Sequence, residues 1–429
     1  MLRRLAIDVT PLRASRDFRL LWFGELVSSA GSQIALVAVF VQVYALTNSV
    51  AAVGLVGLVR LVPLALATLL GGPIIDTRDR RRLLLMAEMG QLLSSAVLMV
   101  GALMGKPPVA LVYVGAALVS GCGGFAASIR SAISPNLVSK QQLPSMVALN
   151  QLMFNSTMIV GPAIGGLVID EFGLAVAYGL DVMSFLAAIV SCFLIRAQVP
   201  TRESVAAEVV GGSFANGWSQ LTEGLRFLRG QRVLQSTFYV DLIAMIFGMP
   251  RALFPVLAVT QFGASKATQG SVVGLLFSAV AVGAVVAALT TGWVRHVRRH
   301  GLAVLWAVAI WGLGIVLFGL SGDSLPFALA SLALAGAADV VSAVFRGSIL
   351  QSTVPDNLRG RMSSVHILVV VGGPGVGDVE AGLVAAVFNP VASVVIGGAV
   401  CIAGVVLLAL AVPEFARYRA PHVNEGAGS

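Results

Sequence analysis

Long apolar segments, separated by short polar gaps, restrict the possible folds of this chain more than any other feature. Each is close to the roughly 20 residues that an α-helix needs to cross a lipid bilayer. Twelve such segments are expected, at 20–46, 50–75, 83–104, 109–130, 145–169, 174–195, 236–262, 267–292, 302–320, 326–349, 361–387 and 391–412. Backbone N–H and C=O groups in hydrocarbon must find partners within their own segment, which favours helices. The sequence therefore predicts an all-α integral membrane protein with twelve transmembrane helices.

The composition excludes a soluble globular protein of this length. Hydrophobic residues make up 57% of the chain, its mean hydropathy is +0.92 and only 11% of its residues are charged. Soluble domains carry about 25% charged residues, so most of this chain is expected to lie in a lipid bilayer. The net charge of +8 does not indicate a nucleic-acid partner, because the basic residues fall in short clusters between the apolar segments.

The distribution of basic residues predicts the orientation in the membrane. With the N-terminus inside, the cytoplasmic segments hold all but four of the 28 Lys and Arg residues. Lys106 and Lys266 fall in external loops, and Arg60 and Arg251 fall within spans. The positive-inside rule then places both termini in the cytoplasm. Arg greatly outnumbers Lys, which is typical of a GC-rich bacterial genome, and a multi-pass protein of the bacterial cytoplasmic (inner) membrane is expected.

One long polar interruption divides the chain. The predicted organisation is an N-terminal six-helix bundle at 1–195, a cytoplasmic linker at 196–235, a C-terminal six-helix bundle at 236–412 and a cytoplasmic tail at 413–429. The linker contains an amphipathic pattern from Asn216 to Arg229, which predicts a helix on the inner membrane surface.

The two halves repeat at the level of charged residues. Three positions recur at an offset of 216 residues: Arg16 and Arg232, Glu25 and Asp241, and Arg130 and Arg346. Secondary transporters commonly place their substrate at the interface between such repeats. The repeated charges within apolar segments are therefore candidates for function, because an ionisable residue in a membrane is costly.

The polar gap at 71–82 reads Gly-Gly-Pro-Ile-Ile-Asp-Thr-Arg-Asp-Arg-Arg-Arg. It resembles a loop of the major facilitator superfamily of secondary transporters, with the pattern Gly-x-Leu-Ala-Asp-Arg-x-Gly-Arg-Arg/Lys. The matching residues are Gly72, Asp76, Arg80 and Arg81, whereas Thr77 and Asp79 depart from the pattern. An aspartate at the second glycine position resembles the drug- and siderophore-efflux branch that contains the enterobactin exporters.

The resemblance covers essentially the whole chain and implies two pseudo-symmetric six-helix bundles. In this family the segments that carry Glu25 and Arg130 adjoin each other, as do those that carry Asp241 and Arg346. Two symmetry-related ion pairs, Glu25–Arg130 and Asp241–Arg346, are therefore expected at the inner mouth of a transport pathway. The alternative for each pair is a static clamp between helices.

Deeper charges suggest two further contacts. The family fold implies that Arg60 and Glu380 face each other across the halves, which predicts a contact that closes the outer gate. Arg251 and Asp339 share a depth near the midplane, where a second pair is expected. Structural pairs that merely hold the bundle are the alternative. Asp181 is expected to reach the outer surface, because its helix is peripheral in the family.

Small residues mark the segment at 145–169. Gly161, Pro162, Gly165 and Gly166 resemble the Gly-Pro-x-x-Gly-Gly end of the motif that distinguishes exporters in the superfamily. Small residues alone predict a close helix crossing, and the resemblance favours export over import.

The family pattern also implies a conformational latch made by Gly72, Asp76, Arg80 and Arg81. Asp76 would accept hydrogen bonds at the positive N-terminus of the segment at 361–387. Arg80 or Arg81 would pair with a neighbouring carboxylate, so that the inner side is held shut.

The resemblance implies a secondary active transporter that exports an amphiphilic small molecule, siderophore-like or drug-like, by alternating access as a proton antiporter. The alternatives are a proton-coupled nutrient importer and a non-transporting membrane receptor. An enzyme is not expected, nor is any cofactor. The chain has no Gly-x-x-x-x-Gly-Lys-Ser/Thr loop for ATP, and its four scattered histidines do not suggest a metal site. The expected partners are a small-molecule substrate, protons and lipid, with the protein acting as a monomer.

Overall fold

The computed structural model describes residues 8–196, 222–355 and 358–419, and every regular element in these ranges is a helix. The first helices are α1 (Thr10–Ala14), α2 (Arg16–Thr47), α3 (Val50–Thr77), α4 (Arg80–Leu103), α5 (Val109–Ile133), α6 (Leu143–Phe172) and α7 (Leu174–Leu194). The later ones are α10 (Arg232–Phe247), α11 (Phe254–Thr260), α12 (Gln269–Thr290), α13 (His300–Gly319), α14 (Leu325–Thr353), α15 (Arg359–Val387), α16 (Pro390–Ala411) and α17 (Pro413–Arg417). Short 3₁₀ turns include η4 (Arg251–Leu253).

Eleven stretches of the described residues are long and apolar enough to cross a membrane. They coincide with eleven of the twelve expected segments. The segment expected at 361–387 lies in α15, which is helical but is not among the eleven. The all-helical membrane fold is thus confirmed, and the twelfth span and the two-bundle arrangement stay predictions.

Side-chain caps explain where several helices begin. The Ser15 hydroxyl accepts the Phe18 backbone N–H at 3.2 Å at the start of α2, and Ser49 accepts that of Ala52 at 3.3 Å in α3. Such caps satisfy backbone donors that have no partner within the helix. Asn48, with a φ of 49°, ends α2 directly before Ser49. The connection from α2 to α3 is therefore a tight two-residue turn.

The chain divides into two compact units. The first contains the described residues 8–196 together with 251–278, and the second contains the described residues 222–250 and 279–419. This division differs from the predicted bundle boundaries, because 251–278 belongs to the first unit. Within the linker, 222–228 are helical, and the rest of the predicted amphipathic helix, up to residue 221, lies outside the described residues.

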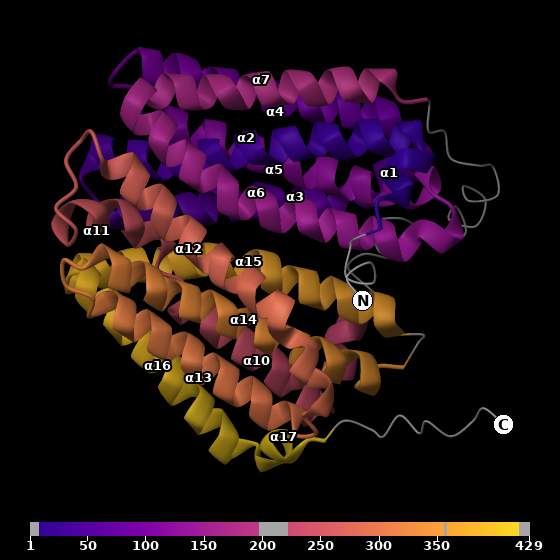
Figure 1. The fold of residues 1–429 in the computed structure, drawn as a ribbon, viewed down its shortest axis with the longest axis vertical. Coiled ribbons are helices and arrows are strands. Elements are labelled where there is room, and N and C mark those ends of the chain that lie inside the picture. Colours follow the sequence, from indigo (N-terminus) through magenta and orange to yellow (C-terminus); the bar gives the residue numbers. More distant parts are fainter. Residues whose placement is uncertain (1–7, 197–221, 356–357, 420–429) are drawn as a thin grey trace. The chain divides into compact units, whose positions relative to one another are not determined.

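In the first unit α7 packs against both α2 and α4, and α5 lies against α3 and α4 (Figure 1). In the second unit α13 packs on α14 and α16, while α10 packs on α15 and α16. Gly312 and Gly398 meet where α13 crosses α16: a Cβ on Gly398 would lie 2.6 Å from the Gly312 carbonyl oxygen. Small residues allow this close approach, as is usual between membrane helices.

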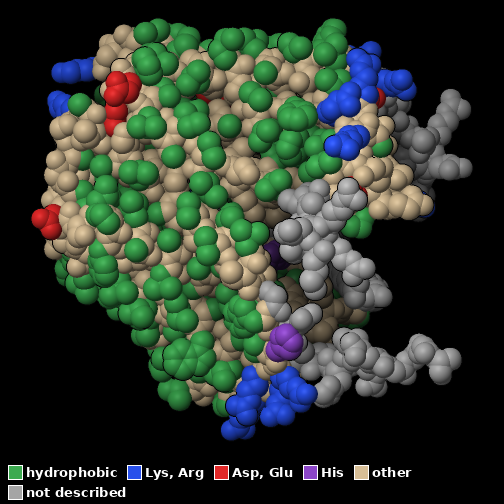
Figure 2. Space-filling view, in the orientation of Figure 1, with side chains coloured by type: hydrophobic (Ala, Val, Ile, Leu, Met, Phe, Trp, Pro, Cys, Tyr) green, Lys and Arg blue, Asp and Glu red, His purple; other side chains and the backbone are tan. Residues whose placement is uncertain are grey.

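Large apolar side chains remain exposed on the outside of the helices. Leu103, Leu289 and Leu410 are among the most exposed of them. Figure 2 shows hydrophobic side chains over most of the visible helix surface, with Lys and Arg side chains at its margins. A monomeric soluble protein rarely shows so large an apolar surface, and lipid contact accounts for it.

Candidate functional site: two arginine–carboxylate clusters

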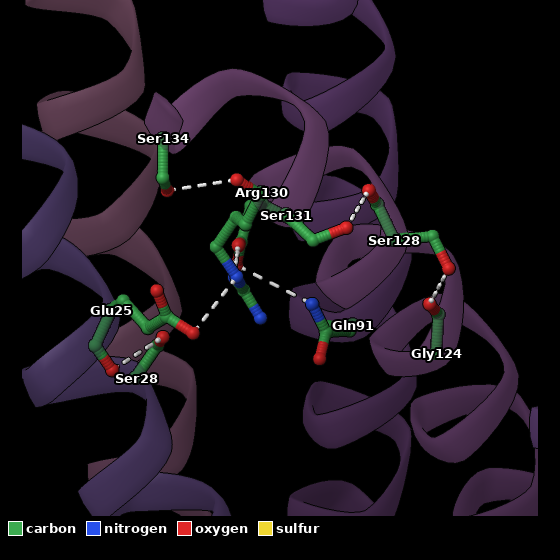
Figure 3. Close-up of polar contacts among 9 residues, drawn as sticks. Glu25, Ser28, Gln91, Gly124, Ser128, Arg130, Ser131 and Ser134 are labelled. Carbon is green, nitrogen blue, oxygen red and sulfur yellow. Dashed lines mark hydrogen bonds and ion pairs between the residues drawn. The ribbon is translucent and has the colours of Figure 1, made fainter. Parts of the chain in front are cut away.

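Arg130 joins three helices of the first unit. It lies near the end of α5, and its Nε is 3.3 Å from Glu25 Oε1 of α2. Its Nη1 is 2.5 Å from Glu88 Oε1 of α4. Figure 3 shows Glu25 and Arg130 pointing toward each other from their two helices. The predicted Glu25–Arg130 contact is therefore present, and a second carboxylate accompanies it.

Glu88 is a functional candidate that was not expected from the sequence. Only 1% of its side chain is exposed, against 22% for Glu25. Its second oxygen accepts the Gln91 side-chain amide at 3.4 Å. Glu88 lies within the predicted span 83–104. The rule that singled out Glu25, an ionisable residue inside an apolar segment, would have found it too.

Arg346 of α14 forms the corresponding cluster in the second unit. Its Nη1 contacts Asp241 Oδ1 of α10, as predicted, and its Nη2 is 3.8 Å from Asp339 Oδ1. The Asp241 side chain is 3% exposed and that of Asp339 is 45% exposed. A pocket beside this cluster is lined by Thr237, Phe238, Asp241, Ala343, Arg346, Gly347, Leu350 and His366.

The two clusters share their central pair but not their second carboxylate. A shift of 216 residues takes Glu88 to Val304, so the repeat supplies no counterpart in the second unit. There the second carboxylate comes instead from Asp339, on the same helix as the arginine. With its carboxylates ionised, each cluster holds two negative charges and one positive charge. Each can therefore accept a proton and become neutral.

The other two predicted contacts link different units. Arg60 lies in α3 of the first unit and Glu380 in α15 of the second. Arg251 lies in η4 of the first unit, whereas Asp339 belongs to the second and contacts Arg346. The Arg60–Glu380 and Arg251–Asp339 contacts both stay predictions.

The predicted loop at 71–82 is mostly helical. Helix α3 continues to Thr77, and only Arg78 and Asp79 separate it from α4. Gly72 is therefore a helical residue, although Gly71 and Pro73 flank it. The side chain of Asp76 lies outside the described residues, so its latch role stays a prediction.

The two latch arginines bind the carbonyl ends of neighbouring helices. Arg80 Nη1 donates to the Ala132 carbonyl of α5 at 3.3 Å. Arg81 donates to the Cys192 and Phe193 carbonyls of α7 at 3.1 and 2.5 Å. Basic side chains suit these positions, because the last carbonyls of a helix lack partners and carry partial negative charge. The sequence predicts a carboxylate partner for Arg80 or Arg81. The structure instead gives Arg81 two carbonyl oxygens of α7 as partners.

The small residues of α6 lie against two helices. A Cβ on Gly161 would meet Gln33 of α2 at 2.5 Å, and one on Gly165 would meet Ile34 at 3.0 Å. Gly166 faces α12, where a Cβ would lie 2.7 Å from the Gly270 carbonyl carbon. Pro162 lies inside the helix between them. The close crossing that these residues predict is present on both sides of α6.

Asp170, one turn beyond Gly166, closes the α6–α12 contact. Its two carboxylate oxygens accept the backbone N–H groups of Gly270 and Ser271, each at 2.7 Å. These donors belong to the first turn of α12, so Asp170 acts as its N-terminal cap from another helix. Further along, the Ser278 hydroxyl donates to the Ile159 carbonyl at 2.6 Å.

Comparison with known proteins agrees with this architecture. Residues 7–425 match the major facilitator family described as transmembrane secretion effector. The enterobactin exporter EntS of Salmonella typhi is 26% identical over 422 residues, with 96% of each chain covered. The enterobactin exporter EntS of Shigella boydii serotype 18 is 27% identical over 419 residues, again with 96% of each chain covered.

Solved structures share the fold at low sequence identity. A POT family transporter in complex with 5-aminolevulinic acid has a TM-score of 0.70 and 13% identity, covering 94% of this chain and 97% of its own. The nucleoside transporter NupG has a TM-score of 0.70 and 13% identity, covering 94% of this chain and all of its own. The protein is thus a membrane transporter rather than an enzyme, and a multi-pass protein of the bacterial inner membrane. The chain belongs to the transmembrane secretion effector family of the major facilitator superfamily.

Proposed function

We propose that the protein exports an amphiphilic small molecule by alternating access, in exchange for protons. The observation that carries this proposal is the pair of buried arginine–carboxylate clusters at repeat-related positions, around Arg130 and Arg346. Each cluster has one carboxylate more than its arginine can neutralise. A proton taken up by Glu25 removes its attraction to Arg130, so the contact between α2 and α5 is weakened. A proton taken up by Asp339, which shares α14 with Arg346, leaves the charge of Arg346 to be compensated by Asp241 of α10 alone.

Exposure decides which carboxylate of each cluster exchanges the proton. Glu25 and Asp339 are the exposed members, and Glu88 and Asp241 are the buried ones. We assign proton exchange to Glu25 and Asp339, because each is the more exposed carboxylate of its cluster. The buried partners keep the arginine charge compensated in both states, since an uncompensated buried charge is costly.

The direction and the substrate are supported by the relatives. The relatives described above are named enterobactin exporters, and the small-residue motif of α6 resembles that of exporters. The pocket beside Arg346 combines the apolar side chains of Phe238 and Leu350 with the polar Thr237 and His366. This lining has apolar and polar members, which is compatible with an amphiphilic solute. Enterobactin is therefore the first substrate to test.

Transport into inside-out vesicles tests the proposal. With the vesicle lumen made acidic, wild-type protein should load enterobactin into the lumen, and collapse of the gradient should stop the loading. Glu25→Gln and Asp339→Asn should each lower proton-driven loading by at least about tenfold, which corresponds to about 1.4 kcal/mol. Glu171→Gln, at the end of α6, is the matched control and should transport normally.

Other outcomes would point to the alternatives. Accumulation only in right-side-out vesicles would indicate a nutrient importer. Binding without gradient-driven movement in either orientation would indicate a receptor. Full coupling in both carboxylate variants would contradict the proton role of the clusters.

A further inference from the structure

Asp181 is a fully buried carboxyl group outside both arginine–carboxylate clusters. The sequence suggests that it reaches the outer surface, but the structure shows it 0% exposed. It lies on α7, which packs against α2 and α4. The expectation fails because the side of α7 that carries Asp181 faces these helices.

In the part of the chain that the structure describes, the hydrogen-bond partners of the Asp181 side chain are hydroxyl groups. Ser95 Oγ of α4 donates to its Oδ2, and Ser32 Oγ of α2 lies 3.5 Å from its Oδ1. Gly31 of α2 has no side chain to crowd Asp181, whereas a Cβ at this position would lie only 3.0 Å from Asp181 Oδ1. Among the described residues, no Lys, Arg or His side chain lies within ion-pair distance of Asp181. A permanently ionised carboxylate in such a place would be costly.

Hydroxyl partners suit a carboxyl group that gains and loses a proton. A serine hydroxyl is both a donor and an acceptor, and its hydrogen rotates to suit its partner. When Asp181 is ionised, Ser32 and Ser95 can both donate to it. When Asp181 is protonated, one of them can accept its O–H while the other donates. Both protonation states are thus satisfied without movement of a helix.

A buried polar face of α4 connects this site with the Arg130 cluster. Glu88, Gln91 and Ser95 are all buried, and their spacing of three and four residues places them on one side of the helix. Of the titratable groups on neighbouring helices, Glu88 of α4 acts on Asp181, and Tyr178 lies on its own helix. The Tyr178 hydroxyl donates to Gln42 at 2.7 Å. Among the described residues, no charged side chain of α2 or α6 has a hydrogen bond or ion pair with Asp181.

We propose that Asp181 is a second proton-binding site of the first unit, coupled through like charge to Glu88. Asp181 binds its proton more firmly while Glu88 is ionised, because two neighbouring negative charges repel each other. Replacement of Glu88 by a neutral residue would therefore make Asp181 release its proton more readily. The transport role of the site rests on the proposed proton exchange, but proton binding itself can be measured without transport.

Infrared difference spectroscopy of the purified protein in lipid tests the site directly. A protonated carboxyl group has a C=O stretching band that a carboxylate or an amide lacks. Wild-type protein should show this band at neutral pH and lose it as the pH rises. Asp181→Asn should remove one component of the band, and Glu25 and Asp339 keep their own components, whereas Asp170→Asn should leave the whole band unchanged. A band of the wild-type size and pH dependence in Asp181→Asn would overturn the proposal.

Two further variants test the coupling even if Asp181→Asn fails to fold. Glu88→Gln removes the like charge, so the pH at which the band disappears should fall by about one unit. Ser95→Ala removes a donor to the ionised form, so this pH should rise. An unchanged midpoint in both variants would contradict the assignment to Asp181.

Transport measurements distinguish a failure of the Asp181 site from a failure of proton-driven export. Asp181→Asn should alter the pH profile of enterobactin loading in inside-out vesicles. A wild-type profile in Asp181→Asn would exclude a coupling role for the site while leaving proton-driven export by the wild-type protein intact. Absence of gradient-driven loading by the wild-type protein would instead contradict the proposed function, whatever the infrared band shows.

Discussion

At the scale of single residues, burial separates carboxylates that share one arginine. Glu88 and Glu25 both contact Arg130, but only Glu25 is appreciably exposed. Breaking a buried ion pair leaves an uncompensated charge and costs about 3 kcal/mol or more, whereas an exposed pair contributes about 1 kcal/mol or less. Glu88→Gln should therefore lower the thermal unfolding temperature in detergent much more than Glu25→Gln. Equal losses in the two variants would contradict this distinction.

A pH-dependent contact is expected at Asp8, before α1. Its carboxylate accepts the Thr10 hydroxyl, the Thr10 backbone N–H at 3.0 Å and the Ser145 hydroxyl of α6 at 2.8 Å. These hydrogen bonds, led by that of the Thr10 hydroxyl, lower the pKa of Asp8. A lowered pKa in the folded state stabilises the contact above the unfolded value of about 3.9, and the effect is lost as the pH falls through the folded value.

Hydrogen exchange of α1, corrected for the intrinsic rate, measures this contact. Protection should be constant near neutral pH and should decrease below about pH 4. Asp8→Asn should show the reduced protection already at neutral pH. Identical protection in the variant and the wild type would mean that α1 is held by its apolar contacts alone.

At the scale of helices, α6 and α12 are joined by backbone contact and one carboxylate. Asp170 accepts the N–H groups of Gly270 and Ser271 in the first turn of α12. Asparagine has only one acceptor oxygen, so Asp170→Asn leaves one donor unsatisfied and should cost about 1 kcal/mol. Faster hydrogen exchange at 269–272 would reveal the loss. Glu171→Gln changes the neighbouring carboxyl group and should leave these amides unchanged.

At the scale of the whole molecule, alternating access requires that a contact between the halves opens and closes. The predicted Arg60–Glu380 contact is the candidate for the outer gate. Arg60→Cys and Glu380→Cys, placed in a background without the native cysteines, should cross-link only while the outer side is closed. The yield should therefore depend on substrate and pH. A yield that ignores both would indicate a static pair.

The sequence by itself determined the membrane character and eleven spans, and together with the family resemblance it predicted the Glu25–Arg130 and Asp241–Arg346 contacts. Hydropathy is a local property of about 20 residues, and the repeat gives related positions related surroundings. Only the tertiary structure placed Glu88 against Arg130, buried Asp181 and assigned 251–278 to the first unit. These outcomes depend on which helix faces meet. Which faces meet is decided by close approach at small residues. Gly166 and Gly270 are such a pair, and they lie far apart in the chain.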